Sequence, residues 1–366
     1  MLTQQVDGTQ RDLAQQYRRY AAMRSDVGLV MTGQCPIGCR HCLASSTMQV
    51  PDLPALETHL AWIAKVSRVD RCKSFYITGG EPFLYFQRLL QVVDGCHTRG
   101  LRSTVITSAY WATSGAIAAD KLKRLAHVGL TGITVSADEY HQESVPLPNV
   151  SRVLCAAKEC GINPTVALTY VPRGRSAARV KRDLRRELGQ RTLDGVQIEA
   201  GGIVKLGRAY ELVFPGTRPA EQPKLVCNAL GPVIQPDGTV ASCCRAPLPS
   251  TSPLIIGDLN AEDFQPIYQR FLSHSIIPFI QTWGLLEMLE RLIDEGLATG
   301  LEGYRDAREE EICELCQAIL SEPAHVSFFA EQFHVPEVRK RLGILTFVLY
   351  GDPALLEAPD TSTQMS

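Results

Sequence analysis

The feature that most restricts the fold of this chain is a repeated alternation of short apolar runs with amphipathic stretches. Five stretches have helical periodicity: Leu56–Val66, Phe86–His97, Ala116–His127, Ser151–Cys160 and Ala177–Gly189. Six runs have the length and composition of strands: Gly28–Met31, Phe75–Thr78, Ser103–Thr107, Gly132–Ser136, Pro164–Tyr170 and Gly195–Glu199. Strands that alternate with helices form a parallel sheet, and right-handed crossovers curl that sheet toward a barrel. We therefore expect an α/β fold with a partial (β/α)6 TIM-like barrel, in which chemistry gathers at the carboxyl ends of the strands.

Composition excludes several other classes of protein. The chain has 366 residues, of which 45% are hydrophobic and 21% charged, and its formal charge is −2. This near-neutral balance does not favour a nucleic-acid or acidic-membrane partner. The apolar run around Leu342–Tyr350 is about half of the 20 residues that span a bilayer. We expect a cytoplasmic protein with no membrane and no nucleic-acid partner.

The alternation stops near Val213, and the pattern beyond it predicts a second unit. The stretch that begins at Phe214 is typical of a linker, and a cysteine-bearing segment with a hairpin signal and several helical stretches follows. We expect a C-terminal cysteine-rich domain built from a β-hairpin plus helices. The predicted boundaries are an N-terminal helical lead-in (1–24), the barrel (25–212), the cysteine-rich domain (220–320) and a C-terminal helical tail (321–366).

Twelve cysteines indicate metal binding, because a reducing cytosol disfavours a disulfide framework. Cys35, Cys39 and Cys42 lie within eight residues, directly after the first predicted strand. Three thiolates in one loop can hold three irons of a 4Fe–4S cluster and leave the fourth iron open to a small molecule. A structural zinc site would require a fourth nearby ligand. A zinc loop, or cysteines without a metal, is the alternative.

The C-x3-C-x2-C spacing of this loop resembles that of the radical S-adenosylmethionine (SAM) enzymes. In that family an aromatic residue before the third cysteine packs beside the adenine, and His41 occupies this place. The second strand ends in Gly79-Gly80-Glu81-Pro82, which resembles the family's GGEP turn. The resemblance implies that this turn engages the methionine amine of SAM. Taken alone, the same four residues would be a common surface turn.

Two further segments resemble the family. Ser136 and Asp138 follow the fourth strand, where family members contact the ribose or carboxylate of SAM; an ordinary strand-ending turn is the alternative. Arg208 lies in a Gly-Arg-Ala segment that is common after the sixth strand of peptide-modifying members, and it could instead only anchor the loop. Thr107-Ser108-Ala109 departs from the Thr-Asn-Gly of many relatives, which leaves the role of this segment open.

A second set of cysteines resembles the auxiliary-cluster domains of the same superfamily. Cys227 and Cys243 flank a strong hairpin signal at Asp237-Gly238, and Cys313 and Cys316 form a C-x2-C pair. Four thiolates can complete one auxiliary 4Fe–4S cluster, as in the short "twitch" form of a SPASM domain. Spacing alone does not separate iron from zinc, so a zinc ribbon remains the alternative. Cys244 could replace Cys243 as a ligand, or could donate a hydrogen atom as in radical epimerases.

The resemblance implies reductive cleavage of SAM to a 5′-deoxyadenosyl radical that abstracts a hydrogen atom from a substrate. An electron donor of the flavodoxin or ferredoxin type is implied as a partner. We expect an enzyme that modifies a ribosomal peptide by crosslinking, epimerisation or oxidation. The 34 residues before Cys35 are too few for a winged-helix peptide-binding domain, so a separate peptide-recognition protein is a further expected partner.

Two other functions are compatible with the sequence. The first is a radical SAM dehydrogenase or epimerase that acts on a small molecule such as an aminosugar, because the four-cysteine layout resembles that group. The second is a non-catalytic iron–sulfur or zinc-binding protein. Such a binding protein would explain the cysteines but would not require the turn at Gly79–Pro82.

Overall fold

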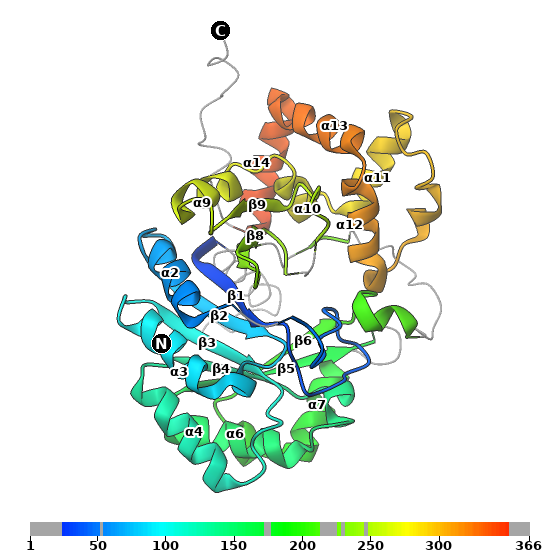
Figure 1. Cartoon of the computed structure of the whole chain (residues 1–366). Helices are drawn as coiled ribbons and strands as arrows, with labels where there is room; N and C mark the ends of the chain where they lie inside the picture. Colours follow the sequence, from blue (N-terminus) through cyan, green and yellow to red (C-terminus); the bar gives the residue numbers. More distant parts are fainter. Residues whose placement is uncertain are drawn as a thin grey trace, which may run out of the picture.

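The sheet at the centre of the molecule follows the predicted alternation (Figure 1). The computed structural model describes residues 24–51, 54–171, 177–212, 225–227, 231–244 and 248–350. Six strands pair in parallel in the order in which they occur along the chain: β1 (Asp26–Thr32), β2 (Ser74–Gly79), β3 (Arg102–Thr107), β4 (Gly132–Ser136), β5 (Asn163–Tyr170) and β6 (Gln197–Gly202). Because every pairing is parallel, the carboxyl ends of all six strands meet at one edge of the sheet. The α/β fold with a partial TIM-like barrel is therefore confirmed.

Five predicted helices are present and cover one face of this sheet. They are α2 (Leu56–Ser67), α3 (Phe86–His97), α4 (Gly115–His127), α6 (Leu147–Glu159) and α7 (Ala177–Leu188). Short helical segments lie between them: η1 (Pro82–Tyr85), α5 (Glu139–Gln142), α8 (Gln190–Leu193) and η2 (Gly207–Glu211). Alternate strand residues such as Leu29, Phe75 and Ile77 are fully buried in the main hydrophobic core, which also contains residues of the helices. Burial of these apolar side chains holds the layers together.

Two element boundaries differ from the sequence prediction by more than two residues. The helix expected to begin at Ser151 begins at Leu147, because Pro148 occupies its first turn, where a missing N–H costs no hydrogen bond. The sixth strand ends at Gly202 rather than at Glu199. Its last residues pair with Thr169 and Tyr170 of β5, so backbone hydrogen bonding outweighs the low strand preference of glycine there.

The C-terminal part of the chain extends the same sheet. Strand β7 (Val233–Ile234) pairs in parallel with β1, and the antiparallel strands β8 (Thr239–Ala241) and β9 (Ile255–Asp258) follow it. The turn between β7 and β8 contains Asp237 and Gly238, and Gly238 has a φ of +92°, so the predicted hairpin is confirmed. The hairpin therefore lies directly beside the first strand of the barrel.

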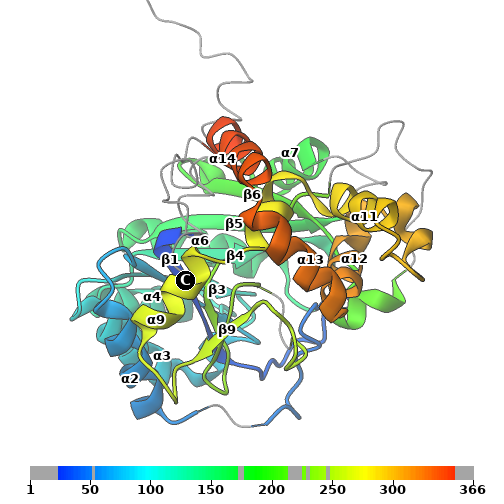
Figure 2. The ribbon, with the colours of Figure 1, turned by 90° about the horizontal axis from the view of Figure 1, so that it is seen from above.

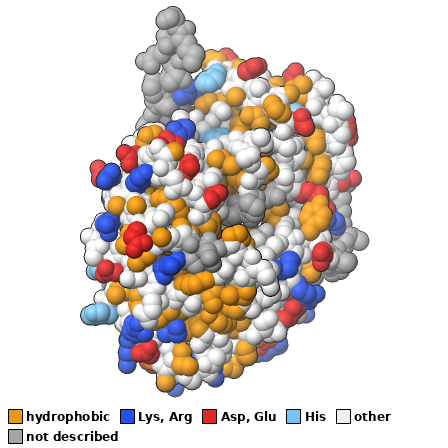
Figure 3. Space-filling view, viewed as in Figure 1, with side chains coloured by type: hydrophobic (Ala, Val, Ile, Leu, Met, Phe, Trp, Pro, Cys, Tyr) orange, Lys and Arg blue, Asp and Glu red, His pale blue; other side chains and the backbone are white. Residues whose placement is uncertain are grey.

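The helices of the C-terminal part are α9 (Phe264–Leu272), α10 (Ile277–Thr282), α11 (Leu285–Asp294), η3 (Glu302–Asp306), η4 (Glu309–Glu311), α12 (Ile312–Leu320), α13 (Pro323–His334) and α14 (Pro336–Tyr350). Helix α9 packs beside α2, while α11 to α14 lie away from α3 and α4 (Figures 1 and 2). Figure 3 shows charges of both signs scattered over one face of the molecule between apolar patches. This mixture agrees with the near-neutral net charge.

Several expectations concern segments outside the described residues. The lead-in over 1–24 lies outside them except for Arg24, and so does the linker from Phe214. Within the described part of the chain, every helix is too short or too polar to cross a membrane.

Candidate functional site

The first three cysteines lie in one loop that follows β1. Cys39 is buried, while Cys35 and Cys42 are half-buried. All three thiols belong to a small apolar cluster with Ile37 and Val145. Within the loop, the Cys42 N–H donates to the Cys39 carbonyl at 3.2 Å. The loop thus presents three thiols from one short, partly desolvated segment.

A segment after β6 holds this loop in place. The Arg208 guanidinium donates Nε–H to the Cys39 carbonyl at 2.9 Å and Nη1–H to the Ser46 carbonyl at 3.0 Å. The Arg208 backbone N–H also donates to the Cys42 carbonyl at 3.1 Å. Gly207 has a φ of +53°, and a Cβ there would lie 2.5 Å from the Cys42 carbonyl oxygen. The Gly-Arg-Ala segment is therefore a clamp on the backbone of the cysteine loop.

The turn after β2 supports the same loop from the other side. The Gly80 N–H donates to the Thr32 carbonyl, and the Glu81 N–H donates to the Gln34 carbonyl. A Cβ on Gly79 would lie 2.2 Å from the Thr32 oxygen, and one on Gly80 would lie 2.1 Å from the Gln34 oxygen. Only glycine permits this approach of two backbones. The two glycines thus fix the residues that lead directly into Cys35.

The Glu81 carboxylate is fully buried and joins the ends of β2 and β3. Its Oε1 accepts from the Phe83 N–H at 3.1 Å and from Thr107 Oγ1 at 2.8 Å. Its Oε2 accepts from the N–H and the Oγ of Ser108 at 2.9 and 2.6 Å. Burial raises the pKa of the Glu81 carboxyl, and these hydrogen bonds oppose that rise. Four donors match the four lone-pair positions of a carboxylate, and contact of Glu81 with a methionine amine stays a prediction.

This geometry explains the departure at Thr107-Ser108-Ala109. Thr107 and Ser108 supply three of the four donors to Glu81, so the polar end of β3 orients the turn after β2. The sequence alone did not predict this role. The sequence signal that could have indicated it is the pair of adjacent hydroxyl residues, Thr107 and Ser108. They stand at the end of the strand that neighbours the turn with Glu81.

A compact polar group lies between the cysteine loop and the end of β4. The Asp138 carboxylate is 2% exposed; its Oδ1 accepts from the N–H groups of Tyr140 and His141, both at 3.1 Å. Its Oδ2 lies 2.8 Å from His141 Nδ1 and accepts from the Thr169 N–H at 3.3 Å. His41 Nε2 lies 3.7 Å from Asp138 Oδ1. Ser136, the other predicted residue, ends β4 and is half-buried.

The rings around Asp138 are stacked and differ in charge. The His41 ring stacks on Tyr140 with centroids 4.7 Å apart and meets the edge of His141 at 4.8 Å. Burial lowers the pKa of His41 to about 4, so this ring is neutral at pH 7. Burial would also lower the pKa of His141, but hydrogen bonds with Asp138 and Cys39 raise it to about 10. Ligand atoms of Cys39, His41 and His141 all lie within 4.8 Å of one another.

The donor set fits a cluster with a small polar ligand beside it. Among the described residues, His41 Nδ1 and Arg208 Nη2 are buried atoms without a hydrogen-bond partner. Both residues contact the cysteine loop or its neighbours. Two buried polar atoms near the three thiols therefore have no hydrogen-bond partner among the protein atoms. Buried polar atoms in native proteins are almost always satisfied. The three thiols and the two unsatisfied atoms are therefore compatible with an iron–sulfur cluster and a polar organic molecule.

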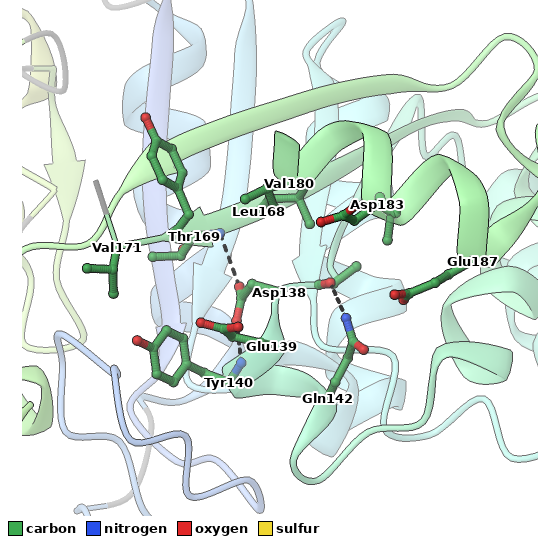
Figure 4. A pocket seen from close by; sticks show the side chains of 13 residues that line it. Asp138, Glu139, Tyr140, Gln142, Leu168, Thr169, Val171, Val180, Asp183 and Glu187 are labelled. Atoms are coloured by element: carbon green, nitrogen blue, oxygen red, sulfur yellow. Dashed lines mark hydrogen bonds between the residues drawn. The ribbon is translucent and has the colours of Figure 1, made fainter. Parts of the chain in front are cut away.

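A cavity of about 510 Å³ opens next to this polar group (Figure 4). Its walls come from the ends of β4 and β5, from α5 and from α7. Asp138, Tyr140 and Thr169 line one side, and Asp183 and Glu187 of α7 line the other. Figure 4 shows Asp138 close to Thr169, with Asp183 and Glu187 of α7 on the other side of the cavity. The cavity has the size of a small-molecule site.

The second set of cysteines also converges. A hydrogen bond with Cys243 raises the pKa of the Cys244 thiol, and Cys227 and Cys313 lie close enough to act on it electrostatically. Cys313 and Cys316 lie near the start of α12, three residues and thus about one turn apart. Thiols from the hairpin, from the segment before it and from α12 therefore meet. Iron or zinc at this place, and the choice between Cys243 and Cys244, stay predictions.

Polar contacts join the barrel to α12. The Lys205 ammonium lies 2.8 Å from Glu311 Oε1, and the Lys205 N–H donates to the Glu310 carbonyl at 2.7 Å. The Tyr210 hydroxyl donates to Glu314 Oε1 at 2.8 Å. Burial would raise the pKa of Glu311, but hydrogen bonds from Arg308 and Lys205 lower it to about 2. These contacts fix the helix that carries Cys313 relative to the end of β6.

Comparison with known families finds a similarity in the N-terminal part of the chain. Residues 29–186 match the sequence profile of the Radical SAM superfamily. This segment contains the three cysteines, the double-glycine turn and Asp138. These residues are therefore similar to the core of the radical SAM enzymes, a superfamily that uses a 4Fe–4S cluster and SAM.

Individual relatives extend the similarity over most of the chain. "Putative peptide biosynthesis protein YydG" of Bacillus subtilis (strain 168) is 19% identical over 312 residues, which cover 83% of this chain and 94% of that protein. The structure of native anSMEcpe with bound AdoMet and Cp18Cys peptide matches 87% of this chain and 99% of its own, with a TM-score of 0.50 and 12% identity. BtrN in complex with AdoMet and 2-DOIA matches 71% of this chain and 88% of its own, with a TM-score of 0.43 and 12% identity. The likeness to anSMEcpe shows a shared fold.

Proposed function

We propose that this protein is a radical SAM enzyme that modifies a peptide with the help of an auxiliary 4Fe–4S cluster. The observation that carries the proposal is the position of the three-cysteine loop. The turn at Gly79–Glu81 and the clamp at Arg208 hold its backbone from two sides, and buried polar atoms beside it lack partners.

The residues of this chain would divide the work as follows. Cys35, Cys39 and Cys42 would hold three irons of the cluster. The turn at Gly79–Pro82, together with His41, Ser136, Asp138 and Arg208, would surround SAM. Bound there, the cluster and SAM supply a 5′-deoxyadenosyl radical that abstracts a hydrogen atom, while the protein binds, orients and excludes water.

A peptide is the favoured substrate for two reasons. The relative from Bacillus subtilis carries a name that assigns it to peptide biosynthesis, and the alignment covers nearly its whole length. The anSMEcpe structure of the same fold contains a bound peptide. An electron donor of the flavodoxin or ferredoxin type and a separate peptide-recognition protein remain part of the proposal. Epimerisation is one form that the modification would take.

Cys244 would provide the hydrogen atom for such an epimerisation: its S–H bond would break as a new C–H bond forms on the substrate radical, and one electron from the electron donor, with a proton from solvent, would restore the thiol. Four thiols are enough for an auxiliary cluster, and Cys227, Cys243, Cys313 and Cys316 supply them. Cys244 is then a fifth thiol beside that cluster. Exchange of Cys244 for alanine should stop epimerisation and leave SAM cleavage intact. Mass spectrometry of the peptide after reaction in D2O measures the epimerisation, and the amount of deoxyadenosine measures the SAM cleavage.

The test of the proposal is anaerobic reconstitution followed by incubation with SAM and dithionite. Wild-type protein should hold about eight irons, and the Cys35/Cys39/Cys42→Ala variant should hold about four. Only the wild type should form 5′-deoxyadenosine. Zinc in place of iron at the second site would remove the auxiliary cluster from the proposal. A loaded first cluster that yields no deoxyadenosine, with or without candidate peptides encoded near the gene, would contradict it.

A further inference from the structure

Glu199 lies on the inner face of the barrel, the face that is turned away from the helices. Side chains alternate between the two faces of a strand, and directly paired residues of neighbouring strands share a face. The fully buried residues Val135 of β4 and Val166 of β5 define the outer face. Ser136 pairs with Ala167, and Ala167 pairs with Glu199. These three residues therefore share the inner face.

The position of Glu199 along the strands places it near the proposed SAM site. Ser136 ends β4 and is one of the residues that would surround SAM. Glu199 stands at the same level two strands away, and neighbouring strands lie about 4.8 Å apart, so roughly 10 Å separate the two backbones. A substrate group held by Glu199 would therefore lie beside SAM.

The inner face has open space next to Glu199. Gly201 follows two residues later on the same face and is exposed, and no described atom lies within 4 Å of a Cβ built there. On β2, Tyr76 lies between the fully buried Phe75 and Ile77 and is itself 38% exposed. The described residues thus bury the outer face of the sheet and leave room on the inner one.

The Glu199 carboxylate has only a neutral partner in the described part of the chain. Its Oε1 accepts from Gln197 Nε2 at 2.8 Å. Burial raises the pKa of Tyr76, and the negative charges of Asp26 and Glu199 raise it further, so the charge of Glu199 acts across the inner face. A carboxylate that loses its water to a substrate is stable only with a donor or an opposite charge in return. Hydrogen bonds from cations are the strongest of these.

We propose that Glu199 binds a basic side chain of the peptide substrate, a lysine or an arginine, in the space beside Gly201. The inference rests on the proposed function, from which it takes the peptide substrate and the place of SAM. Anchored in this way, the basic side chain fixes which neighbouring residue of the peptide faces SAM. Glu199 is thus a specificity-determining residue that touches the substrate away from the reacting atoms.

Selection of peptides tests this assignment without knowledge of the natural substrate. The full-length chain is reconstituted anaerobically, loaded with SAM and used to select from random dodecapeptides displayed on phage. The wild type should enrich lysine or arginine at one position. The enriched peptide is then synthesised with a fluorescent label, and anisotropy measures its affinity for the wild type, Glu199→Gln, Glu199→Lys and Gly201→Leu.

Glu199→Gln should weaken binding by about tenfold or more, because hydrogen bonds to charged groups are the strong ones. Gly201→Leu should also weaken it, because the new side chain fills the space. A peptide with glutamate in place of its basic residue should bind Glu199→Lys more tightly than the wild type. Glu159→Lys is the matched control: Glu159 is exposed at the end of α6, which leads into the start of β5. This variant should bind like the wild type.

Enrichment of peptides without a basic residue, or of no peptide, would overturn the inference. Wild-type affinity of Glu199→Gln at unchanged iron content would overturn it as well. If the variants of Glu199 do not fold, Gly201→Leu alone decides, and binding at the wild-type level would count against the site.

The two proposals fail in different ways. A wild type that forms no deoxyadenosine contradicts the proposed function. A wild type that cleaves SAM and binds peptides independently of residue 199 contradicts only the role of Glu199.

Discussion

At the scale of residues, individual buried polar groups fix the backbone around the site. Glu81 is the clearest case, because its carboxylate is inaccessible to solvent and accepts four hydrogen bonds from β3 and η1. A buried polar group is stable only when its partners are present. The turn after β2, which supports the residues before Cys35, therefore depends on hydroxyl groups at the end of a neighbouring strand.

Exchange of Glu81 for glutamine should destabilise the protein and reduce SAM cleavage. The new NH2 group would face donors that need an acceptor, which costs about 1 to 3 kcal/mol. Denaturant unfolding measures this loss, and a deoxyadenosine assay measures the activity. Glu143→Gln is the control: its carboxylate forms an exposed ion pair with Arg40, and such pairs contribute little to stability. Equal stability of the two variants would contradict the account of Glu81.

The turn after β2 shows how backbone packing controls the site at the scale of elements. Alanine at position 80 would place its Cβ 2.1 Å from a backbone oxygen of Gln34, which cannot move like the end of a side chain. The residues before Cys35 would have to shift. We expect Gly80→Ala to lower deoxyadenosine formation by more than tenfold while the circular dichroism spectrum is retained.

The matched control for this exchange is Gly115→Ala. Gly115 is the first residue of α4, and no atom lies within 4 Å of a Cβ built there. Alanine at an unstrained helical position stabilises by roughly 0.4 to 1 kcal/mol. Full activity of both alanine variants would show that the close approach of the two backbones is not required.

Helix α2 carries an acid-sensitive group, the fully buried His59. Burial lowers the pKa of His59 to about 4, below the value of about 6.5 in an unfolded chain. The unfolded state therefore binds a proton first as the pH falls, so stability is lost between about pH 6.5 and pH 4. This group alone should lower the free energy of unfolding by roughly 2 kcal/mol from pH 7 to pH 5.

The variant His59→Leu tests this linkage. Leucine has no proton to bind, so the variant should lose less stability than the wild type between pH 7 and pH 5. Denaturant titrations at both pH values give the comparison. Identical pH dependence of the two proteins would show that His59 is not the group responsible.

At the scale of the whole molecule, the barrel and the C-terminal part are connected at two places, which together form a joint. The two parts share one sheet, because β7 pairs with β1. Across the opening of the barrel, Lys205 contacts Glu311 just before α12, and both side chains are at most 20% exposed. Two connections on opposite sides thus set the position of the second group of cysteines.

Exchange of Lys205 for methionine should loosen α12 without unfolding the barrel. The lost charged hydrogen bond contributes about 1.5 to 3 kcal/mol. Hydrogen exchange of the amides of residues 312–320 should accelerate, while the amides of β2 and β3 keep their protection. Arg68→Met is the control, because its ion pair with Asp263 is 71% and 62% exposed. Unchanged exchange in α12 would contradict the role of Lys205 in this joint.

The sequence by itself determined the order of strands and helices, the position of the hairpin and the thiols that lie close together along the chain. Hydrophobic periodicity and turn residues are local properties, so they can be recognised without a structure. The same is true of Cys35, Cys39 and Cys42, whose spacing places them in one loop.

Contacts between distant segments were decided only by the tertiary structure. The clamp of Arg208 on the cysteine loop spans more than 160 residues, and the bonds from Thr107 and Ser108 to Glu81 join two neighbouring strands. The approach of His41 to the Asp138 carboxylate was equally invisible in the sequence. Hydrogen bonds of this kind depend on which strand ends meet at the edge of the sheet. That meeting follows from the packing of the whole barrel and not from any local pattern of residues.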